Sequence, residues 1–350
     1  MVEIETIWAP MEQYAIIFGM SIKAWSNFRC GRGCRLDWRR RDQAIFFAVQ
    51  WGARSVERLV ATGMAVLAAG CLGTASPDAS VLDLTAGRYP GLVACWDFGR
   101  AEAPLRSVGA VRATLSPGAG ADPATVAGGP LSGRALRFDG KTDYLTLPYA
   151  KTGALNVRSG QVTVVGWVKW VPGGVGFVGG MWNEHQDGGK RQYGLFVSLP
   201  HYNGGDQVCG HVSRKGGPTP PFPYSIDYSA SAQKVPADTW CCVAFTYDGE
   251  CIRSYLDGRF EPREPELIDH TKGFPGYPEG LVQSKNPYRY PDGIGDNGSD
   301  FTVGAVCLAR GMGNFFHGDM AGLAVYDRAL SAEELRELAD ATLASRQLSP

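Results

Sequence analysis

Short apolar runs separated by turn residues fill the chain from residue 91 to residue 326, and this pattern limits the fold more than any other feature. Many runs stop at glycine, proline or aspartate, and no helical period appears before residue 331. Short strands with frequent turns are typical of an all-β sandwich of antiparallel sheets. The run at 161–170 is apolar on both faces, which predicts a central strand. We therefore expect strands at residues 92–98, 135–138, 144–147, 161–170, 177–182, 192–199, 207–213, 240–247, 250–256, 301–309 and 323–326.

The last predicted strand runs directly into a helix signal. Asp327 and Arg328 form a tight turn, and Ser331 follows as a candidate N-cap. Glu334 stands three residues after Ser331, which completes the spacing of a capping box. The sequence therefore predicts one short helix at the C-terminal end of the sandwich.

A hairpin near residue 248 carries three of the nine cysteines. Asp248 and Gly249 are a strong signal for a two-residue turn, and this turn pairs Thr246 with Cys251. In that register Cys242 and Cys251 are roughly 13 Å apart along the strands, which is too far for a disulfide. Cys241 and Cys242 are neighbours, so they point to opposite faces. We predict that these three thiols are buried and share no bridge.

Five segments carry short motifs, and the order and spacing of these motifs are more informative than any one of them. The segments are FDGKTDY at 138–144, VVGWVK at 164–169, WCCVAFTYDG at 240–249, YLDG at 255–258 and FHGDMAGLAVYDRALS at 316–331. Together they resemble the laminin-G-like (LamG) domains of the concanavalin A-like superfamily. The resemblance implies a two-sheet antiparallel jelly roll with a short C-terminal helix over residues 91–343. That superfamily includes lectins, carbohydrate-binding modules, glucanases and adhesion modules, so the resemblance implies a fold rather than an activity.

The first ninety residues differ from the rest. Residues 1–58 are rich in Trp and Arg and share no period with the strands, so we leave them unassigned and outside the mature protein. Residues 59–74 form a short apolar segment after a basic flank, as in a signal peptide. The segment ends in Ala-Ala-Gly-Cys71, which resembles a bacterial lipoprotein signal, although Ala68 stands where Leu is usual. A buried or peripheral helix is the alternative interpretation of this segment. Residues 75–90 are a small-residue linker.

These features predict an exported bacterial protein of the periplasm, the outer membrane or the extracellular space. Membrane attachment is expected only through a lipidated Cys71. The formal net charge is −1, with both signs mixed along the chain, which argues against nucleic acid or an anionic membrane surface as a partner.

The sequence lacks the carboxylate pair of a retaining glucanase, which needs two acidic side chains on one strand about 5 Å apart. Glu184 and Asp187 are separated by a glycine-rich loop, and Glu264 and Glu266 flank Pro265, which disfavours a central strand. No Gly-x-Ser-x-Gly motif is present either. We therefore predict no catalytic residues.

The best candidate for a ligand surface lies where two predicted strands meet around a polar loop. Sugar recognition needs aromatic faces next to hydrogen-bonding groups, and a proline-rich loop at 216–224 offers a further wall. A core position for Trp182 and an ordinary Glu184–Arg191 ion pair are the alternative. The predicted ligand-binding residues are Trp182, Asn183, Glu184, Arg191, Tyr193 and His211.

Calcium is the only metal that the sequence suggests. Asp292, Asp296 and Asp300 lie in a loop rich in glycine and offer the oxygen ligands that calcium prefers. The family pattern implies a further aspartate in the last strand, but Ala321 stands at that position. Turn chemistry alone also explains aspartates in such a loop.

The function that these observations favour is non-catalytic binding of a glycan or glycoprotein. Two alternatives stay open at this point. One is a polysaccharide-degrading enzyme, a glycoside hydrolase or lyase, with an unrecognised site. The other is a structural or adhesion domain without a glycan pocket.

Overall fold

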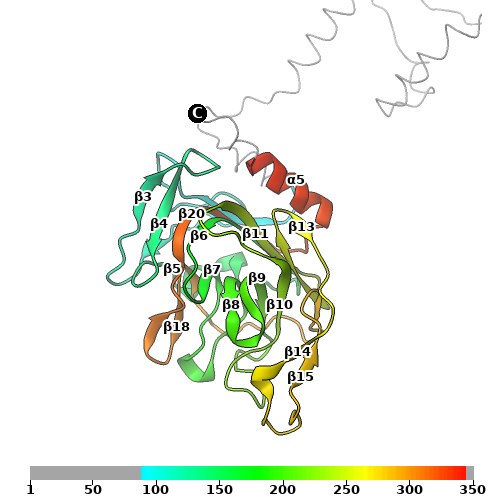
Figure 1. Ribbon diagram of the computed structural model, residues 1–350. Coiled ribbons are helices and arrows are strands. Elements are labelled where there is room, and N and C mark those ends of the chain that lie inside the picture. The colour runs from blue at the N-terminus through cyan, green and yellow to red at the C-terminus, as the bar shows by residue number, and fades with distance from the viewer. Residues whose placement is uncertain (1–87, 344–350) are drawn as a thin grey trace, which may run out of the picture. The chain divides into compact units, whose positions relative to one another are not determined.

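The computed structural model describes residues 88–343. The predictions about residues 1–58, the signal-like segment 59–74, Cys71 and all but the end of the 75–90 linker lie outside these residues. Within them, two antiparallel sheets pack face to face and a single α-helix closes the chain (Figure 1). The predicted all-β sandwich with a short C-terminal helix is therefore confirmed.

The larger sheet has nine strands, and β6 lies at its centre between β11 and β20. Eight of the nine residues of β6 are buried, as expected for a run that is apolar on both faces. The strand order is β13-β12-β11-β6-β20-β4-β3, with β1 paired to β20 and β16 to β12. The bounds are β1 (Leu92–Asp97), β3 (Ala124–Ala127), β4 (Arg134–Asp139), β6 (Val162–Trp170), β11 (Trp240–Tyr247), β12 (Cys251–Leu256), β13 (Arg259–Phe260), β16 (Tyr288–Arg289) and β20 (His317–Tyr326).

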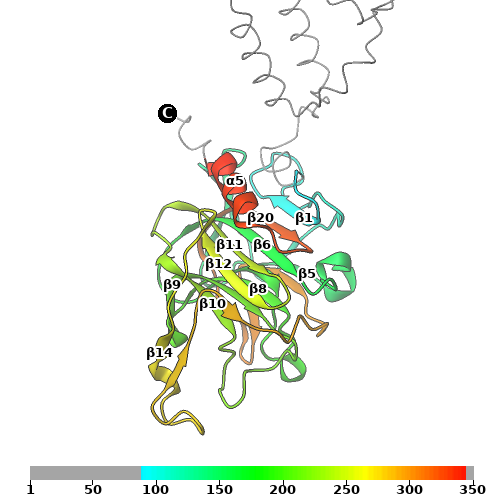
Figure 2. The ribbon, with the colours of Figure 1, turned by 90° about the vertical axis from the view of Figure 1, so that its right-hand side faces the viewer.

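The second sheet has seven strands in the order β10-β9-β8-β7-β17-β5-β2. Its strands are β2 (Ser116–Pro117), β5 (Leu145–Leu147), β7 (Gly176–Met181), β8 (Tyr193–Leu199), β9 (Gly204–Val212), β10 (Tyr228–Lys234) and β17 (Phe301–Val303). Two small ribbons project beyond the sheets: β14 (Glu266–Ile268) with β15 (Leu281–Gln283), and β18 (Val306–Leu308) with β19 (Gly311–Gly313) (Figure 1). Figure 2 shows the β14 ribbon from the side.

The single strand expected at 301–309 is two strands in the structure. Gly304 interrupts it with a φ of +86°, a left-handed conformation that other residues rarely adopt. A Cβ at this position would lie 2.7 Å from the Phe138 ring. The break turns β18 away from the second sheet, and this turn places the β18–β19 ribbon beside the site described below.

The main core fills the space between the two sheets. On β8, the side chains of Tyr193, Leu195 and Val197 enter this core, whereas Phe196 belongs to a separate apolar cluster on the outer face of the same sheet. Successive side chains of a strand point to opposite faces, so the seven-stranded sheet has a second buried surface beyond the sandwich core. That outer surface is where the candidate site lies.

The helix α5 (Ala332–Leu343) packs on the outer face of the nine-stranded sheet. The indole of Trp167 donates a hydrogen bond to Thr342 Oγ1 over 2.7 Å. The predicted capping box is confirmed, because Glu334 N donates to Ser331 Oγ over 3.2 Å and Ser331 N donates to the Glu334 carboxylate over 2.8 Å. No helix in residues 88–343 has the length and hydropathy of a membrane span.

The β11–β12 hairpin departs from the predicted register. Thr246 pairs with Arg253 rather than with Cys251. The two central turn residues are Gly249 and Glu250. The side chain of Asp248 stabilises this turn, since its Oδ1 atom accepts hydrogen bonds from the backbone of Glu250 (2.9 Å) and Cys251 (2.7 Å). Gly249 takes a φ of +99°, which suits the first central position of a hairpin turn.

The prediction that the three hairpin thiols are buried is correct for Cys241 and Cys242 and wrong for Cys251. No disulfide joins Cys241, Cys242 and Cys251 to one another. Cys241 lies in the core between the sheets and Cys242 in the cluster under α5, so the two neighbours do point to opposite faces. Cys251 is half-buried rather than buried, since it stands at the hairpin end.

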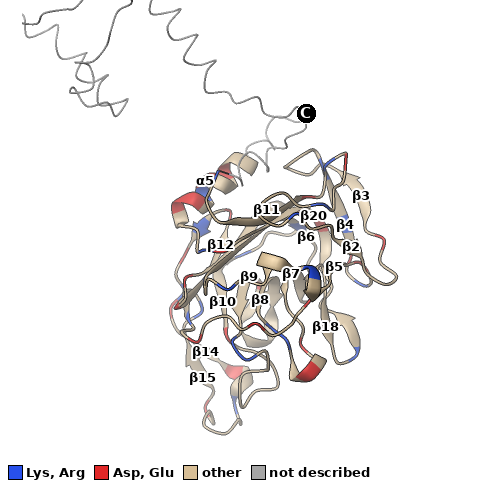
Figure 3. Ribbon diagram, turned by 180° about the vertical axis from the view of Figure 1, so that it is seen from behind, with Lys and Arg blue, Asp and Glu red and all other residues tan. Residues whose placement is uncertain are grey.

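Acidic and basic residues are interspersed over the strands and loops (Figure 3). This distribution agrees with the near-zero net charge of the chain.

Candidate functional site

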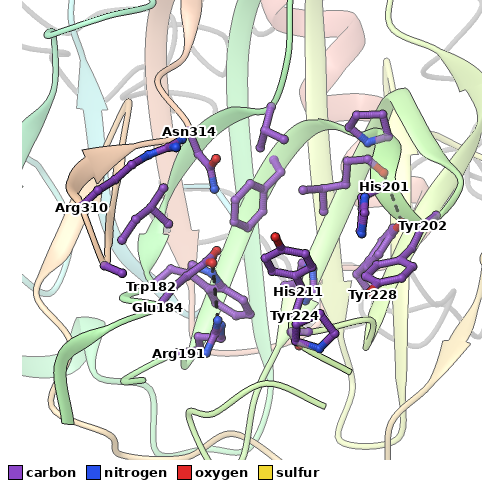
Figure 4. A pocket seen from close by; sticks show the side chains of 18 residues that line it. Trp182, Glu184, Arg191, His201, Tyr202, His211, Tyr224, Tyr228, Arg310 and Asn314 are labelled. Atoms are coloured by element: carbon purple, nitrogen blue, oxygen red, sulfur yellow. Dashed lines mark hydrogen bonds and ion pairs between the residues drawn. The ribbon is translucent and has the colours of Figure 1, made fainter. Parts of the chain in front are cut away.

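A pocket of about 600 Å³ opens on the outer face of the seven-stranded sheet (Figure 4). Outward side chains of β8, β9 and β10 and the end of β7 form its floor. Its walls come from separate segments: the turn at 199–202, the loop at 223–225 and the β18–β19 ribbon with Asn314. The site is therefore assembled from loops that are far apart in the sequence.

Aromatic rings form the floor. The His211 ring lies at the centre, with centroids 4.7 Å from Trp182, 5.6 Å from Phe196 and 4.9 Å from Tyr228. Trp182 and Phe196 also meet edge to face at 5.8 Å. All four side chains are buried. Edge-to-face and offset contacts of this kind stabilise an aromatic cluster beyond the area it buries, so the floor is rigid and mostly apolar.

Glu184 and Arg191 stand at one edge of the floor. The Trp182 indole donates to Glu184 Oε1 over 3.1 Å, and Arg191 Nη2 donates to Glu184 Oε2 over 3.4 Å. Arg191 Nη1 also donates to the carbonyl of Gly216 over 3.0 Å. The arginine is buried, and this burial lowers its pKa. The Glu184 side chain keeps 21% exposure, so its carboxylate is the polar group of this edge that a ligand can reach.

His211 is a buried, neutral imidazole. Burial lowers its pKa well below the ordinary value, and the charge of Arg191 lowers it further. Its Nδ1 atom has no hydrogen-bond partner in the described part of the chain. The floor of the pocket therefore carries no charge at neutral pH.

The rim is more exposed. Tyr224 is 51% exposed, and its ring meets His201 edge to face at 5.1 Å. His201 also lies 5.1 Å from His270. Burial and the neighbouring His270 lower the pKa of His201. Figure 4 shows Arg310 and Asn314 on one side of the pocket and His201 and Tyr202 on the other.

The structure brings four of the six predicted binding residues together. Trp182, Glu184, Arg191 and His211 all line the pocket, and Tyr224 from the predicted loop wall joins them. Whether these residues contact a ligand stays a prediction. Trp182 packs in a buried apolar cluster and also lines the floor of the pocket.

Tyr193 and Asn183 do not line the pocket. Tyr193 points into the sandwich core, where its hydroxyl donates to the Leu155 carbonyl over 2.6 Å. The cause is strand alternation, since Tyr193 and Phe196 are an odd number of positions apart on β8. The Asn183 amide is used within its own loop, where it accepts from His185 N and bonds to Gln186.

Sequence reasoning did not find several residues of the pocket. His201, Tyr202 and Tyr228 were not predicted, and neither were Arg310 and Asn314. They come from four separate segments, and none belongs to a motif with recognisable spacing. The β10 strand that carries Tyr228 was itself missed.

The three aspartates proposed for calcium are not gathered into a metal site. Among residues 88–343, no group of three or more His, Cys, Asp or Glu side chains is arranged to hold a metal ion. Asp296 instead accepts a hydrogen bond from the Tyr149 hydroxyl over 2.6 Å, and Asp300 accepts one from Tyr149 N over 2.7 Å. These carboxylates fix a surface loop, as turn chemistry allows.

The carboxylates of the pocket bear on the alternative of a polysaccharide-degrading enzyme. Of the residues that line it, Glu184 alone carries a carboxylate. Glycosidases that use a carboxylate pair need a second acidic group about 5 to 10 Å away. The pocket does not supply one.

No protein-family model matches this chain, and no curated protein matches it. Among solved structures, the chain is similar to domain 4 of AbnA, a GH43 extracellular arabinanase from Geobacillus stearothermophilus, solved with arabinotriose. The identity is 18%, the coverage is 71% of this chain and 98% of that one, and the TM-score is 0.46.

The chain is also similar to the CBM40 of the Ruminococcus gnavus IT-sialidase bound to α2,3-sialyllactose, at 13% identity, 59% and 95% coverage and a TM-score of 0.39. A structure of botulinum neurotoxin type C, whose cell entry depends on two ganglioside molecules, matches at 8% identity and a TM-score of 0.41. That match covers 72% of this chain but only 51% of the neurotoxin chain. At these identities and scores the likenesses assign no function to this chain.

Proposed function

We propose that this domain binds a glycan in the pocket on the outer face of the seven-stranded sheet. The observation that carries the proposal is the exposed aromatic ring of Tyr224 in a pocket that also presents hydrogen-bonding groups. These groups include the carboxylate of Glu184, the amide of Asn314 and the guanidinium of Arg310. A pyranose offers one apolar face for stacking and a rim of hydroxyls for hydrogen bonds. Tyr224 supplies the first kind of contact, and the polar groups supply the second.

The proposed role is binding without catalysis. Glu184 is the lone carboxylate in the lining, and Trp182 and Arg191 both donate hydrogen bonds to it. An acid held in this way orients a ligand hydroxyl rather than cleaving a glycosidic bond with a partner acid. We place the domain among the laminin-G-like sandwiches and the protein outside the cytoplasm, as the motifs and the signal-like segment at 59–74 suggest.

The test is a glycan array on the full chain, followed by calorimetric titration of the best ligand. Tyr224→Ala is expected to weaken binding about fivefold or more with an unchanged melting temperature, since a stacking aromatic contributes about 1 kcal/mol or more. Tyr149→Ala is the matched control, because Tyr149 is 36% exposed and lies outside the pocket lining. The proposal fails if no glycan binds, or if Tyr224→Ala keeps the full affinity.

A further inference from the structure

The pocket carries one charge that no neighbour balances, and that charge is positive. Its lining contains three charged side chains, Glu184, Arg191 and Arg310. Glu184 and Arg191 form an ion pair, so their charges cancel. His211 is neutral, because burial lowers its pKa well below the ordinary value. The remaining charge belongs to Arg310.

Arg310 is exposed at the tip of the ribbon formed by β18 and β19. It has no hydrogen bond or ion pair with any other residue that the structure describes. Unlike Arg191, whose Nη atoms are engaged with Glu184 and Gly216, Arg310 has all of its donors available. A guanidinium presents these donors as a planar fork that matches a carboxylate or a sulfate.

The ribbon holds this cation across the pocket from the exposed aromatic ring. Figure 4 shows Arg310 next to Asn314, on the side away from His201. His201 in turn contacts Tyr224. Tyr224, Arg310 and Asn314 all line this one pocket, so a single sugar bound in it has the aromatic ring, the guanidinium and the amide around it.

We propose that the pocket selects an anionic sugar, whose carboxylate or sulfate group binds Arg310 while its ring stacks on Tyr224. This inference rests on the proposed glycan binding and names its ligand class. A neutral sugar offers Arg310 only hydroxyl acceptors, which form weaker hydrogen bonds with a guanidinium than an anion does. An acidic sugar gains a charge-assisted pair, and the only acid of the lining does not repel it strongly, because Arg191 already neutralises Glu184.

The experiment compares anionic sugars with neutral counterparts, using the full chain and calorimetric titration. One pair is trigalacturonate and its fully methyl-esterified form, which keeps the rings and removes the charge. A second pair is 3′-sialyllactose and lactose, and 3′-sulfated lactose separates sulfate from carboxylate recognition. At least one anionic member should bind about tenfold or more tightly than its neutral counterpart, with an advantage that declines at high salt.

Variants of Arg310 then locate the preference. Arg310→Gln should abolish the advantage of the anionic sugar, and Arg310→Lys should keep part of it, because lysine binds an anion as a point charge. Arg336→Gln is the matched control, since Arg336 is exposed on α5, which packs on the other sheet. Equal binding of charged and neutral sugars, or a preference that survives in Arg310→Gln, overturns the inference and leaves glycan binding intact. Absence of binding to every glycan overturns both.

Discussion

The indole nitrogen of Trp182 donates a hydrogen bond to Oε1 of Glu184 over 3.1 Å. This bond holds the ring in the floor of the pocket, where Phe196 and His211 pack against it. Trp182 is therefore part of the floor and orients the one acidic group that a ligand can reach. The stacking platform of the proposed site is Tyr224, which the rim leaves exposed.

Trp182→Ala should destabilise the protein rather than simply remove a ligand contact. The side chain is buried, and truncation of a buried tryptophan costs about 3–5 kcal/mol of unfolding free energy. Trp182→Phe keeps most of the packing and should cost less, although it leaves Glu184 without its indole donor. Thermal melts and urea titrations of both variants measure the difference. A stable Trp182→Ala protein that binds no glycan would instead make Trp182 a direct stacking residue.

The ion pair at the start of α5 should make stability depend on acid pH. Arg328 donates to both oxygens of Glu334, over 2.7 and 2.9 Å, and these bonds lower the pKa of Glu334 from 4.5 to about 2. Since the pKa of Glu334 is lower in the folded state than in the unfolded state, the ion pair contributes its full stabilisation above pH 4.5. This stabilisation is lost as the pH falls toward 2. Glu334→Gln should cost about 1 kcal/mol at neutral pH and little in acid.

Urea unfolding at several pH values measures this effect. Glu333→Gln is the control, because Glu333 lies in the same helical turn, is exposed and has no described partner. If Glu334→Gln loses as much stability in acid as at neutral pH, the ion pair is not its source.

Lys285 should limit stability near neutral pH. Its Nζ atom is buried without a hydrogen-bond partner and lies 3.9 Å from the centroid of the Tyr228 ring. Burial lowers its pKa from 10.5 to about 7. In the unfolded chain Lys285 stays protonated up to about pH 10.5. Burial of the charged form therefore lowers the unfolding free energy by its full amount below pH 7, and this loss of stability becomes smaller as the pH rises from 7 to 10.5.

Lys285→Met removes the charge with little change in volume. We expect it to raise the unfolding free energy at neutral pH by about 1–4 kcal/mol, as when other buried charges are replaced by apolar groups. The rise of stability between pH 7 and 10.5 should also flatten in this variant. A loss of stability on substitution would show that the contact with the Tyr228 ring outweighs the cost of burial.

Residues 1–58 should be dispensable for the sandwich. They share no period with the strands, and a jelly roll closes its core with its own strands. A chain that begins at Ala75 is expected to melt within a few degrees of the full chain in calorimetry. A decrease of roughly 10 °C or more would mean that the N-terminal residues contribute to the fold.

The fold was predictable because its signals are local. The run that is apolar on both faces placed β6 at the centre of a sheet, and the spacing of Ser331 and Glu334 placed the start of α5. The hairpin register was not predictable from the Asp248 and Gly249 pair. Which two residues occupy the turn depends on the hydrogen bonds that Asp248 accepts, and these form only in the folded hairpin.

The candidate site was predictable only where its residues flank one loop. Trp182, Glu184 and Arg191 are close in the sequence, and the polar loop between two strands indicated them. Tyr193 was assigned to the wrong face, because proximity in sequence does not fix which side of a strand faces a pocket.

By itself, then, the sequence determined the central strands of both sheets, the closing helix and one edge of the pocket, since these depend on neighbours along the chain. The tertiary structure alone decided that Tyr224 and Arg310 share a pocket with that edge. Their meeting depends on how the loop at 223–225 and the ribbon of β18 and β19 fold over the outer face of the sheet. Contacts between distant loops follow no sequence period, so only the packed chain reveals them.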